Sequence, residues 1–463
     1  MTRRLPAVAG HERVLLVLFV LSLSLVTPYV RGDGNGYYAY VRSIWIDGDL
    51  DFRNEYARAD PKFREAEQNW WTTPAGLTVN PWAPGSVVLW TPFFLAGHGV
   101  AVAARALGVD VATDGFSPPY RWAVAVGSAW YGFLGLLLCY RLALAYVAPR
   151  IALAAVLGLW AASSLPVYMY FLPTMAQANG MFTVSLLVYF WHRTRGGRRP
   201  GQWLLLGLLA GFSAAVKTET IVFLAVPALA LLRVRQQGDP AGRADAKTVG
   251  LVAAGFAVGL APHMVIKTLL YGRPWDTGYE YVLPAFLQPR PIEMLFSSLH
   301  GMFSWTPILL LATLGFGLFV RKDREFALAL GIPCVALYYL ASGWQSLGVA
   351  ASSFGNRPFV SATVFFTLGL AALIEWLTAR GRFRWVAVAL AGFGVWNVLF
   401  IVQFGLGLIP RGDYFPWSRM IANQFRVPLI AVRYGGLFFR DREAFIAAIQ
   451  QRAESQRRAG EVQ

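Results

Sequence analysis

Residues 14–29, VLLVLFVLSLSLVTPY, form an apolar stretch that is followed almost at once by a polar run, RGDGNGYYAYVRSIWIDGDLDFRNEY, over residues 31–56. The first stretch approaches the length of a membrane-spanning helix. The second contains four aspartates among aromatic residues: Asp33, Asp47, Asp49 and Asp51. Because charged residues make up only 14% of the chain, this acidic run is where we expect chemistry.

The composition is that of a membrane protein. The 463-residue chain is 56% hydrophobic, with a mean hydropathy of +0.47, well above the apolar share of a soluble protein. Apolar stretches of roughly 17 to 25 residues recur between short basic breaks, and this length crosses a hydrocarbon layer of about 30 Å as a helix. The runs are too continuous for an outer-membrane barrel. The sequence therefore predicts an all-α polytopic integral membrane protein with about 11 to 13 transmembrane helices.

The net charge of +16 lies mainly in the short segments between apolar stretches. This distribution is typical of the positive-inside rule and not of a clustered nucleic-acid-binding face, so we expect no nucleic-acid partner. Arg3, Arg4 and Arg13 place the N-terminus in the cytoplasm, which puts residue 31 onward on the outer side of the membrane. We interpret the first stretch as a retained anchor, because no small-residue cleavage site is evident.

The crossing count before residue 200 contains a conflict. Each of four apolar segments is counted as one crossing: 83–107, 121–147, 151–171 and 181–192. That count leaves the basic run RTRGGRR, residues 193–199, on the outer side, against the positive-inside rule. Two explanations stay open. Either Gly97-His98-Gly99 marks a broken or re-entrant segment, or the region 121–171 crosses an unexpected number of times.

The chain is expected to form one membrane domain over residues 1–409 and a short, extracytoplasmic tail over residues 410–463, with no internal repeat. The first outer loop, residues 31–82, is the longest connection. Within it, the polar and aromatic pattern of residues 54–71 predicts a helix that lies in the membrane interface. Residues 203–232 fit a hairpin of two short helices that turns at Lys217.

Asp33 is the first candidate for chemistry. It is flanked by Gly32, Gly34 and Gly36, and glycine allows the backbone unusual turns and a close approach to a ligand. A carboxylate at the outer end of the first span is well placed to act as a general base. The alternative is a turn and helix cap for the segment that begins near Tyr37.

A metal site is less well supported. The alternation Asp47, Asp49, Asp51 invites a calcium-loop interpretation, but Phe52 stands where that loop needs glycine and Arg58 where it needs glutamate. The five histidines show no metal-ligand spacing, and Cys139 and Cys334 lie inside apolar stretches. We therefore predict no metal ligands and no cofactor, with a looser divalent site as the alternative to a solvated turn.

Two basic residues are candidates for binding an anionic group. Lys217 interrupts an apolar hairpin, and Arg357 begins a span, so each would be costly unless paired or open to a cavity. Arg fits phosphate oxygens with a bidentate fork, and Lys supplies a point charge. The alternatives are pairing of Lys217 with Glu219 and extension of Arg357 to the membrane interface.

Aromatic and histidine residues complete the candidates. Tyr37 and Tyr38 could stack on a sugar or an isoprenoid, although aromatic residues at a membrane boundary also need no such role. His98 and His300 are placed where they could face an outer cavity, with a structural histidine as the alternative.

Several short segments resemble one family. An Asp just beyond the first span, a Tyr-rich segment and a long outer loop are similar to those of the C-type superfamily of membrane glycosyltransferases. Within that superfamily the resemblance is to bacterial protein O-mannosyltransferase-like and aminoarabinose-transferase-like proteins. The resemblance continues in four further segments: NPWAPGSVVLWTPFF (80–94), GLLAGFSAAVKTE (207–219), HGMFSWTPILLL (300–311) and SSFGNR (352–357).

The resemblance implies roles for individual residues. Asp33 takes the position of the catalytic aspartate, Asp49 that of a second acidic residue in the same loop, and Lys217 and Arg357 positions near a lipid phosphate. Many relatives carry an acidic residue or histidine in the second outer turn, where this chain has TMAQAN, residues 174–179. Neutral amides are neither strong bases nor anionic metal ligands, which weakens a metal-dependent mechanism.

The implied reaction moves a sugar from a polyprenyl-phosphate carrier to a hydroxyl of a lipid, glycan or protein acceptor. It would take place on the outer, periplasmic face of a bacterial inner membrane, with Asp33 as general base and Tyr37, Tyr38, Asp49, Lys217, His300 and Arg357 binding substrate. Two alternatives remain. A transporter or lipid flippase usually shows paired halves, which are not found here, and a catalytically inactive scaffold would share the fold.

Overall fold

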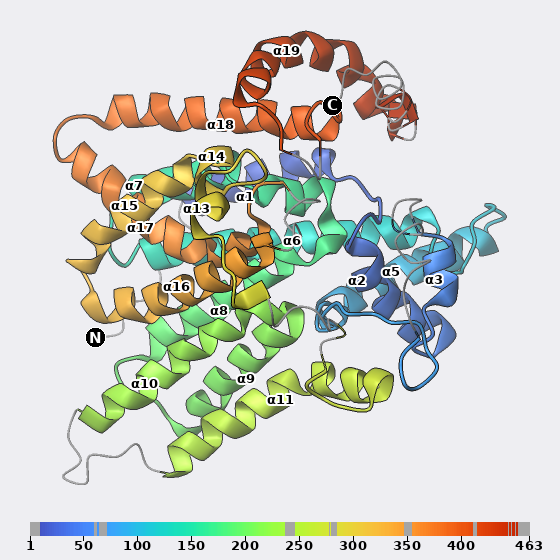
Figure 1. The fold of residues 1–463 in the computed structure, drawn as a ribbon, viewed down its shortest axis with the longest axis horizontal. Coiled ribbons are helices and arrows are strands. Elements are labelled where there is room, and N and C mark those ends of the chain that lie inside the picture. The colour runs from blue at the N-terminus through green and yellow to red at the C-terminus, as the bar shows by residue number, and fades with distance from the viewer. Residues whose placement is uncertain are drawn as a thin grey trace.

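The computed structural model describes residues 10–59, 63, 72–236, 246–276, 278, 285–346, 354–410, 414–442, 444–445, 447–449 and 451. In this part of the chain every element of regular structure is helical, apart from one isolated bridge between Thr72 and Thr78. The α-helices, shown in Figure 1, are α1 (Gly10–Ser22), α2 (Gly34–Arg42), α3 (Arg53–Ala57), α5 (Ser86–Ala106), α6 (Pro118–Ala143), α7 (Pro149–Ala162), α8 (Gln177–Thr194), α9 (Pro200–Val216), α10 (Ala225–Gln236), α11 (Ala246–Tyr271), α13 (Pro291–Phe296), α14 (Met302–Trp305), α15 (Ile308–Val320), α16 (Arg324–Ser346), α17 (Thr363–Thr378), α18 (Phe383–Gly405) and α19 (Trp417–Arg440).

The lengths and composition of these helices confirm the predicted class, an all-α polytopic membrane protein. Six of the described helical segments are long and apolar enough to cross a membrane, and four shorter apolar helices lie among them. The count of about 11 to 13 crossings stays a prediction. In Figure 1 most helices run side by side across the view, while α2, α3 and α5 gather at one end of the bundle.

The first apolar stretch makes a shorter helix than the 16 residues quoted above. The α-helix ends at Ser22 and a single 3₁₀ turn, Leu23–Leu25, follows it. Pro28 prevents the helix from continuing to the end of this stretch, because proline disfavours helical backbone at Thr27 and cannot donate a backbone hydrogen bond. Thr27 N instead donates to Tyr170 O over 2.6 Å, which ties the exit of the first span to the bundle.

Helix α5 resolves part of the conflict in the crossing count. It passes without interruption through Gly97-His98-Gly99, so there is no break at that point. It runs antiparallel to α6: Trp90 Nε1 donates to Ser128 Oγ over 2.8 Å, and His98 Nδ1 lies 2.7 Å from Tyr120 OH. The segment therefore lies beside the first half of α6 and ends near its start, as in an antiparallel pair of helices.

Contacts at the opposite end of the bundle place the basic run on the N-terminal side. Arg141, near the end of α6, pairs with Glu12 at the start of α1 over 2.9 Å. Tyr146, just after α6, donates to Asp323 Oδ2 over 2.7 Å, and Arg195 at the end of α8 pairs with the same carboxylate. Arg195 thus lies at the end of the bundle that contains the start of α1, consistent with the positive-inside rule.

Glycine contacts fix the position of α9, the helix that ends at Lys217. Gly207 and Gly211 of α9 face Gly255 and Gly259 of α11, and a Cβ at any of them would lie about 2.0 to 2.1 Å from a backbone oxygen of the other helix. Such close approach is the usual result of small residues spaced four apart on membrane helices. It sets α9, and with it Lys217, rigidly against α11.

Helix α19 in the tail is amphipathic and touches the exit of the first span. Arg442, just beyond it, donates to the carbonyl oxygens of Ser24 and Val26 and stacks on Phe438 at 4.2 Å. Four exposed arginines recur at intervals of seven, and exposed apolar residues follow another stripe of the helix: Arg419, Arg426, Arg433 and Arg440, with Ile421, Phe425, Leu429, Val432 and Phe439. This pattern is typical of a helix that lies in the plane of a membrane interface.

Some expectations fall on residues that are not described. The predicted interfacial helix of residues 54–71 is described only in part, where α3 covers its first residues; Trp70 and Trp71 lie outside the described residues. The same holds for Ser352 and Ser353 of the SSFGNR segment and for the tail from residue 452.

Candidate active site

Asp33 stands at the start of α2, after a turn that requires glycine. Gly32 has a φ of +52°, in the left-handed region that side chains disfavour. Asp33 occupies the N-cap position, but its side chain makes no capping hydrogen bond. Its Oδ2 instead lies 2.7 Å from Nη1 of Arg357. Asp33 therefore forms an ion pair with Arg357 and does not cap α2, which was the alternative interpretation of the sequence.

Arg357 reaches Asp33 from a distant part of the chain. It begins a short 3₁₀ helix, Arg357–Ala362, that leads directly into α17. The side chains of Arg357 and Asp33 keep 14% and 27% of their surface exposed. A group that enters from this exposed side can therefore compete for either partner. This contact differs from the alternative interpretation, in which the Arg357 side chain extends to the membrane interface.

Lys217 ends α9 and lies in the same neighbourhood. Its Nζ donates to Tyr37 OH over 3.0 Å and lies 3.1 Å from Glu219 Oε1. Lys217 also interacts electrostatically with Arg357. The predicted alternative, pairing with Glu219, is formed, and it is formed inside the cluster that contains Asp33 and Arg357. Two cations and two carboxylates therefore meet at the start of α2.

Tyr37 joins these charges to α2. Burial raises the pKa of Tyr37 above its usual value, and the Lys217 ammonium opposes that shift. The phenol therefore stays protonated near neutral pH. Its oxygen accepts a hydrogen bond from Lys217 Nζ.

A turn before α8 packs against this cluster. A Cβ on Gly34 would lie 2.2 Å from Thr174 Oγ1, and a Cβ on Gly180 would lie 2.8 Å from Lys217 Cγ and 2.9 Å from Ser361 Oγ. Both glycines are required by these close approaches. The turn thus touches α2 beside Asp33 on one side and Lys217 on the other.

Three predicted site residues lie in other surroundings. Tyr38 OH donates to Gly115 O over 2.6 Å, toward the loop that precedes α6. Asp49 accepts from Ser43 Oγ over 2.7 Å within its own turn. His300 is buried with a φ of +59°, and its ring lies 4.6 Å from that of Trp305. The structure does not place these three beside Asp33, and their substrate-binding roles stay predictions.

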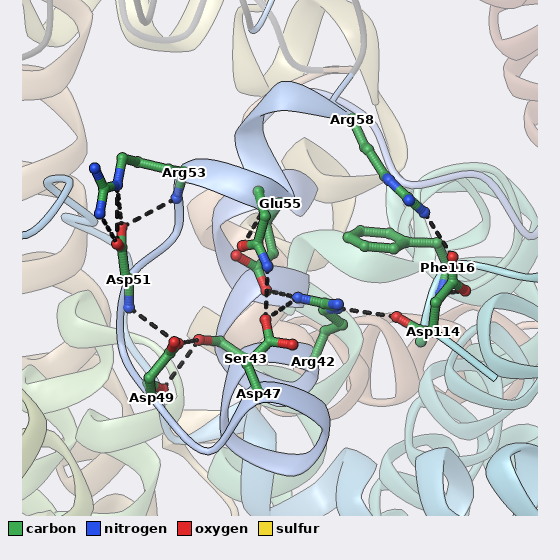
Figure 2. A network of polar contacts seen from close by, with 12 residues as sticks. Arg42, Ser43, Asp47, Asp49, Asp51, Arg53, Glu55, Arg58, Asp114 and Phe116 are labelled. Atoms are coloured by element: carbon green, nitrogen blue, oxygen red, sulfur yellow. Dashed lines mark hydrogen bonds and ion pairs between the residues drawn. The ribbon is translucent and has the colours of Figure 1, made fainter.

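The other three aspartates of the acidic run belong to the polar network drawn in Figure 2. Asp47 accepts from Arg42 and from Asn54, and Asp51 accepts from Arg53. Arg42 also donates to Glu55 Oε1 over 2.8 Å. Each carboxylate of this network is thus directed to a donor within the chain. Among the described residues, no three His, Cys, Asp or Glu side chains are grouped so that they could hold a metal ion.

The sequence did not identify the polar surroundings of the cluster. Thr174 and Ser361 were not singled out, because a lone hydroxyl in an apolar segment gives no signal of its own. Gln177 and Asn179 were noted only as departures from the pattern of relatives, although two amides at the start of an apolar helix are a detectable signal.

Comparison with known proteins identifies a family resemblance in the middle of the chain. Residues 117–266 match the family model described as dolichyl-phosphate-mannose-protein mannosyltransferase. This confirms the predicted resemblance to the C-type superfamily over these residues. They include the turn at 174–180 and Lys217, whereas Asp33 and Arg357 lie outside the matched segment.

Among solved structures, the chain is similar to ArnT from Cupriavidus metallidurans. The form bound to undecaprenyl phosphate is 17% identical with a TM-score of 0.47, and the apo form is 16% identical with a TM-score of 0.44. Each comparison covers 86% of this chain but only 63% and 64% of the two ArnT chains, respectively. A search of curated proteins found no match.

Proposed function

We propose that this protein is a membrane glycosyltransferase that moves a sugar from a polyprenyl-phosphate-linked donor to an acceptor hydroxyl at the outer face of a bacterial cytoplasmic membrane. The observation that carries the proposal is the meeting of one partly exposed carboxylate, Asp33, with two cations, Lys217 and Arg357. The family match over residues 117–266 supports the reaction class. The acceptor is a lipid, a glycan or a protein.

In the proposed reaction Asp33 acts as general base. Its carboxylate accepts the proton of the acceptor hydroxyl while the acceptor oxygen forms a bond to the anomeric carbon. The bond from that carbon to the phosphate oxygen breaks, and polyprenyl phosphate leaves as an anion. A positioned general base contributes roughly 10² to 10⁴ in rate, and direct displacement inverts the anomeric centre.

The ion pair between Asp33 and Arg357 supplies an order of events. Without donor, the guanidinium holds the carboxylate at 2.7 Å. A donor phosphate offers Arg357 two oxygens in bidentate geometry, so donor binding competes for Arg357 and frees Asp33 to meet the acceptor hydroxyl. The base then becomes available only when the leaving group is seated.

Lys217 and Arg357 stabilise the departing phosphate. A preorganised charge at the position where negative charge develops is worth about 3 kcal/mol in comparable enzymes. Tyr37 holds Lys217 in place through their 3.0 Å hydrogen bond and is the aromatic residue that we assign to substrate binding. Glu219 balances the ammonium before the donor arrives.

The test is transfer of radiolabelled sugar from a polyprenyl-phosphate donor by the full-length protein in proteoliposomes. Asp33→Asn should reduce transfer by at least about 10²-fold, without lowering the unfolding temperature enough to explain the loss. Asp51→Asn is the matched control, since Asp51 lies in the same loop and pairs with the exposed Arg53. Full activity of Asp33→Asn would remove the proposed base. Movement of solute without any glycosyl product would favour a transporter.

A further inference from the structure

The turn that leads into α8 buries polar atoms that have no hydrogen-bond partner among the described residues. Thr174, Gln177 and Asn179 are 2%, 2% and 0% exposed. Thr174 Oγ1, Gln177 Oε1 and both polar side-chain atoms of Asn179 make no hydrogen bond. Ser361 Oγ, from the segment between Arg357 and α17, is equally buried and also makes none.

These four side chains come from the segments that surround the charged cluster. Thr174 packs against Gly34, which follows Asp33 in the chain, and Ser361 and Lys217 both pack against Gly180. We call Thr174, Gln177, Asn179 and Ser361 the neutral polar set. The segments that carry it thus contact α2 on one side and the Lys217 side chain on the other.

Other buried amides in the chain differ from this set. Asn397 Nδ2 donates to two backbone carbonyls, Ala161 O and Ser163 O, at 2.9 and 2.8 Å. Gln403 likewise donates to Met420 O over 3.1 Å. These amides connect helices through their amino groups, although Asn397 Oδ1 and Gln403 Oε1 have no partner. Asn179 has no such contact, although an unsatisfied buried amide costs folding free energy.

The backbone of the same turn is strained. Ala176 has a φ of +61°, in the left-handed region that residues with a Cβ rarely adopt. It immediately precedes α8 and orients the first turn of that helix, where Gln177 and Asn179 lie. Strain and unsatisfied polar groups that coincide in one turn are typical of a ligand site.

We infer that the neutral polar set is the subsite for the hydroxyl groups of an uncharged sugar on the donor, an inference that rests on the proposed function. A sugar hydroxyl both donates and accepts, and amide and hydroxyl side chains offer both functions. Of the nearby carboxylates, Asp33 is assigned to the acceptor hydroxyl in the proposed reaction, and Glu219 is paired with Lys217. The turn itself, residues 173–180, contains no acid, so it offers no counter-charge for the ammonium of an amino sugar.

The first test replaces Asn179 with leucine, which has the same branched arrangement of side-chain heavy atoms but no hydrogen-bonding group. No hydrogen bond between described residues is lost, so the ligand-free unfolding temperature should fall less than in the control below. The value of kcat/KM for transfer should fall about tenfold, the value of one good hydrogen bond. Asn397→Leu is the matched control, and it should lower the unfolding temperature. The inference is overturned if Asn179→Leu lowers the unfolding temperature as Asn397→Leu does and leaves kcat/KM unchanged.

The second test introduces a carboxylate of nearly the same shape. Gln177→Glu and Asn179→Asp should shift the ratio of kcat/KM values for a neutral and an amino sugar, both on polyprenyl phosphate, by about tenfold toward the amino sugar. If both variants remain active but kcat/KM falls equally for the two donors, this inference is overturned while the proposed function stands. Absence of transfer by the wild-type protein with both donors would overturn the proposed function as well.

Discussion

The two ends of α2 carry two polar clusters that differ in kind. At its end, Arg42 pairs with Asp47 and Glu55, which lie 5 and 13 positions further along the chain. At its start, Asp33 pairs with Arg357, which lies far along the chain, just before α17. The ion pairs of Arg42 form within one loop, and Asp114 and Phe116 join that cluster from the segment before α6. The Asp33 pair instead joins the start of α2 to the segment that leads into α17.

The clusters also differ in how their polar groups are satisfied. In the Arg42 cluster, drawn in Figure 2, each carboxylate has a donor within the chain, and Arg42 and Arg58 both lie over the ring of Phe116, at 4.6 and 4.7 Å. Around Asp33 the charges are paired, but neutral groups such as Asn179 are buried without a partner. Glu55 Oε2 in the Arg42 cluster also lacks a partner, so the difference is that the unsatisfied groups around Asp33 are neutral and more numerous. Such groups can still hydrogen-bond an uncharged ligand.

The sharpest test of this contrast is Arg42→Met. Arg42 and Glu55 keep only 8% and 3% of their side-chain surface exposed, so removing the arginine leaves a buried carboxylate without its counter-charge. We expect a loss of about 3 to 5 kcal/mol in the free energy of unfolding of the loop, measured by hydrogen exchange of α2 and α3. A loss below about 1 kcal/mol would show that this cluster is not structural.

The corresponding change in the other cluster is Arg357→Gln. Because Asp33 is more exposed, water can replace part of the lost contact, and the unfolding temperature should change little. Transfer should fall by roughly 10²- to 10³-fold through loss of phosphate stabilisation. The rate of transfer is measured with radiolabelled donor and the full-length variant in proteoliposomes. A variant that is strongly destabilised yet retains its kcat would reverse the assignment of the two clusters.

The Arg42 cluster should also respond to pH. Burial raises the pKa of Glu55 to about 7, although Arg42 opposes the shift. Because the folded state holds this proton more tightly than the unfolded chain, stability is greatest below about pH 4.5 and is lost as the pH rises through about 7. We expect a fall of about 1 to 3 kcal/mol across this window in the loop. Glu55→Gln should flatten this part of the profile, and hydrogen exchange of α3 at several pH values measures it.

The smallest effect is expected from Asp51→Asn. The hydrogen bonds from Arg53 lower the pKa of Asp51, but the arginine is largely exposed and solvent screens the pair. Neither the unfolding temperature nor the rate of transfer should change measurably. A clear loss of transfer would extend the site into the acidic run and weaken the distinction between the two ends of α2.

The sequence determined the class of protein and the types of residue at the site. The length of each apolar segment and the position of each arginine can be read locally, without knowing how distant segments pack. These properties therefore predicted membrane helices and an N-terminus on the cytoplasmic side. The rarity of charge in apolar surroundings singled out Asp33, Lys217 and Arg357 for the same reason.

Only the tertiary structure decided which of these residues meet. It turned α5 back along α6, paired Asp33 with Arg357, and placed Tyr37 rather than Tyr38 against Lys217. The physical reason is that a partner depends on how distant segments pack. Close glycine contacts such as Gly180 with Lys217 and Ser361 set these distances, and such packing leaves no local pattern in the sequence.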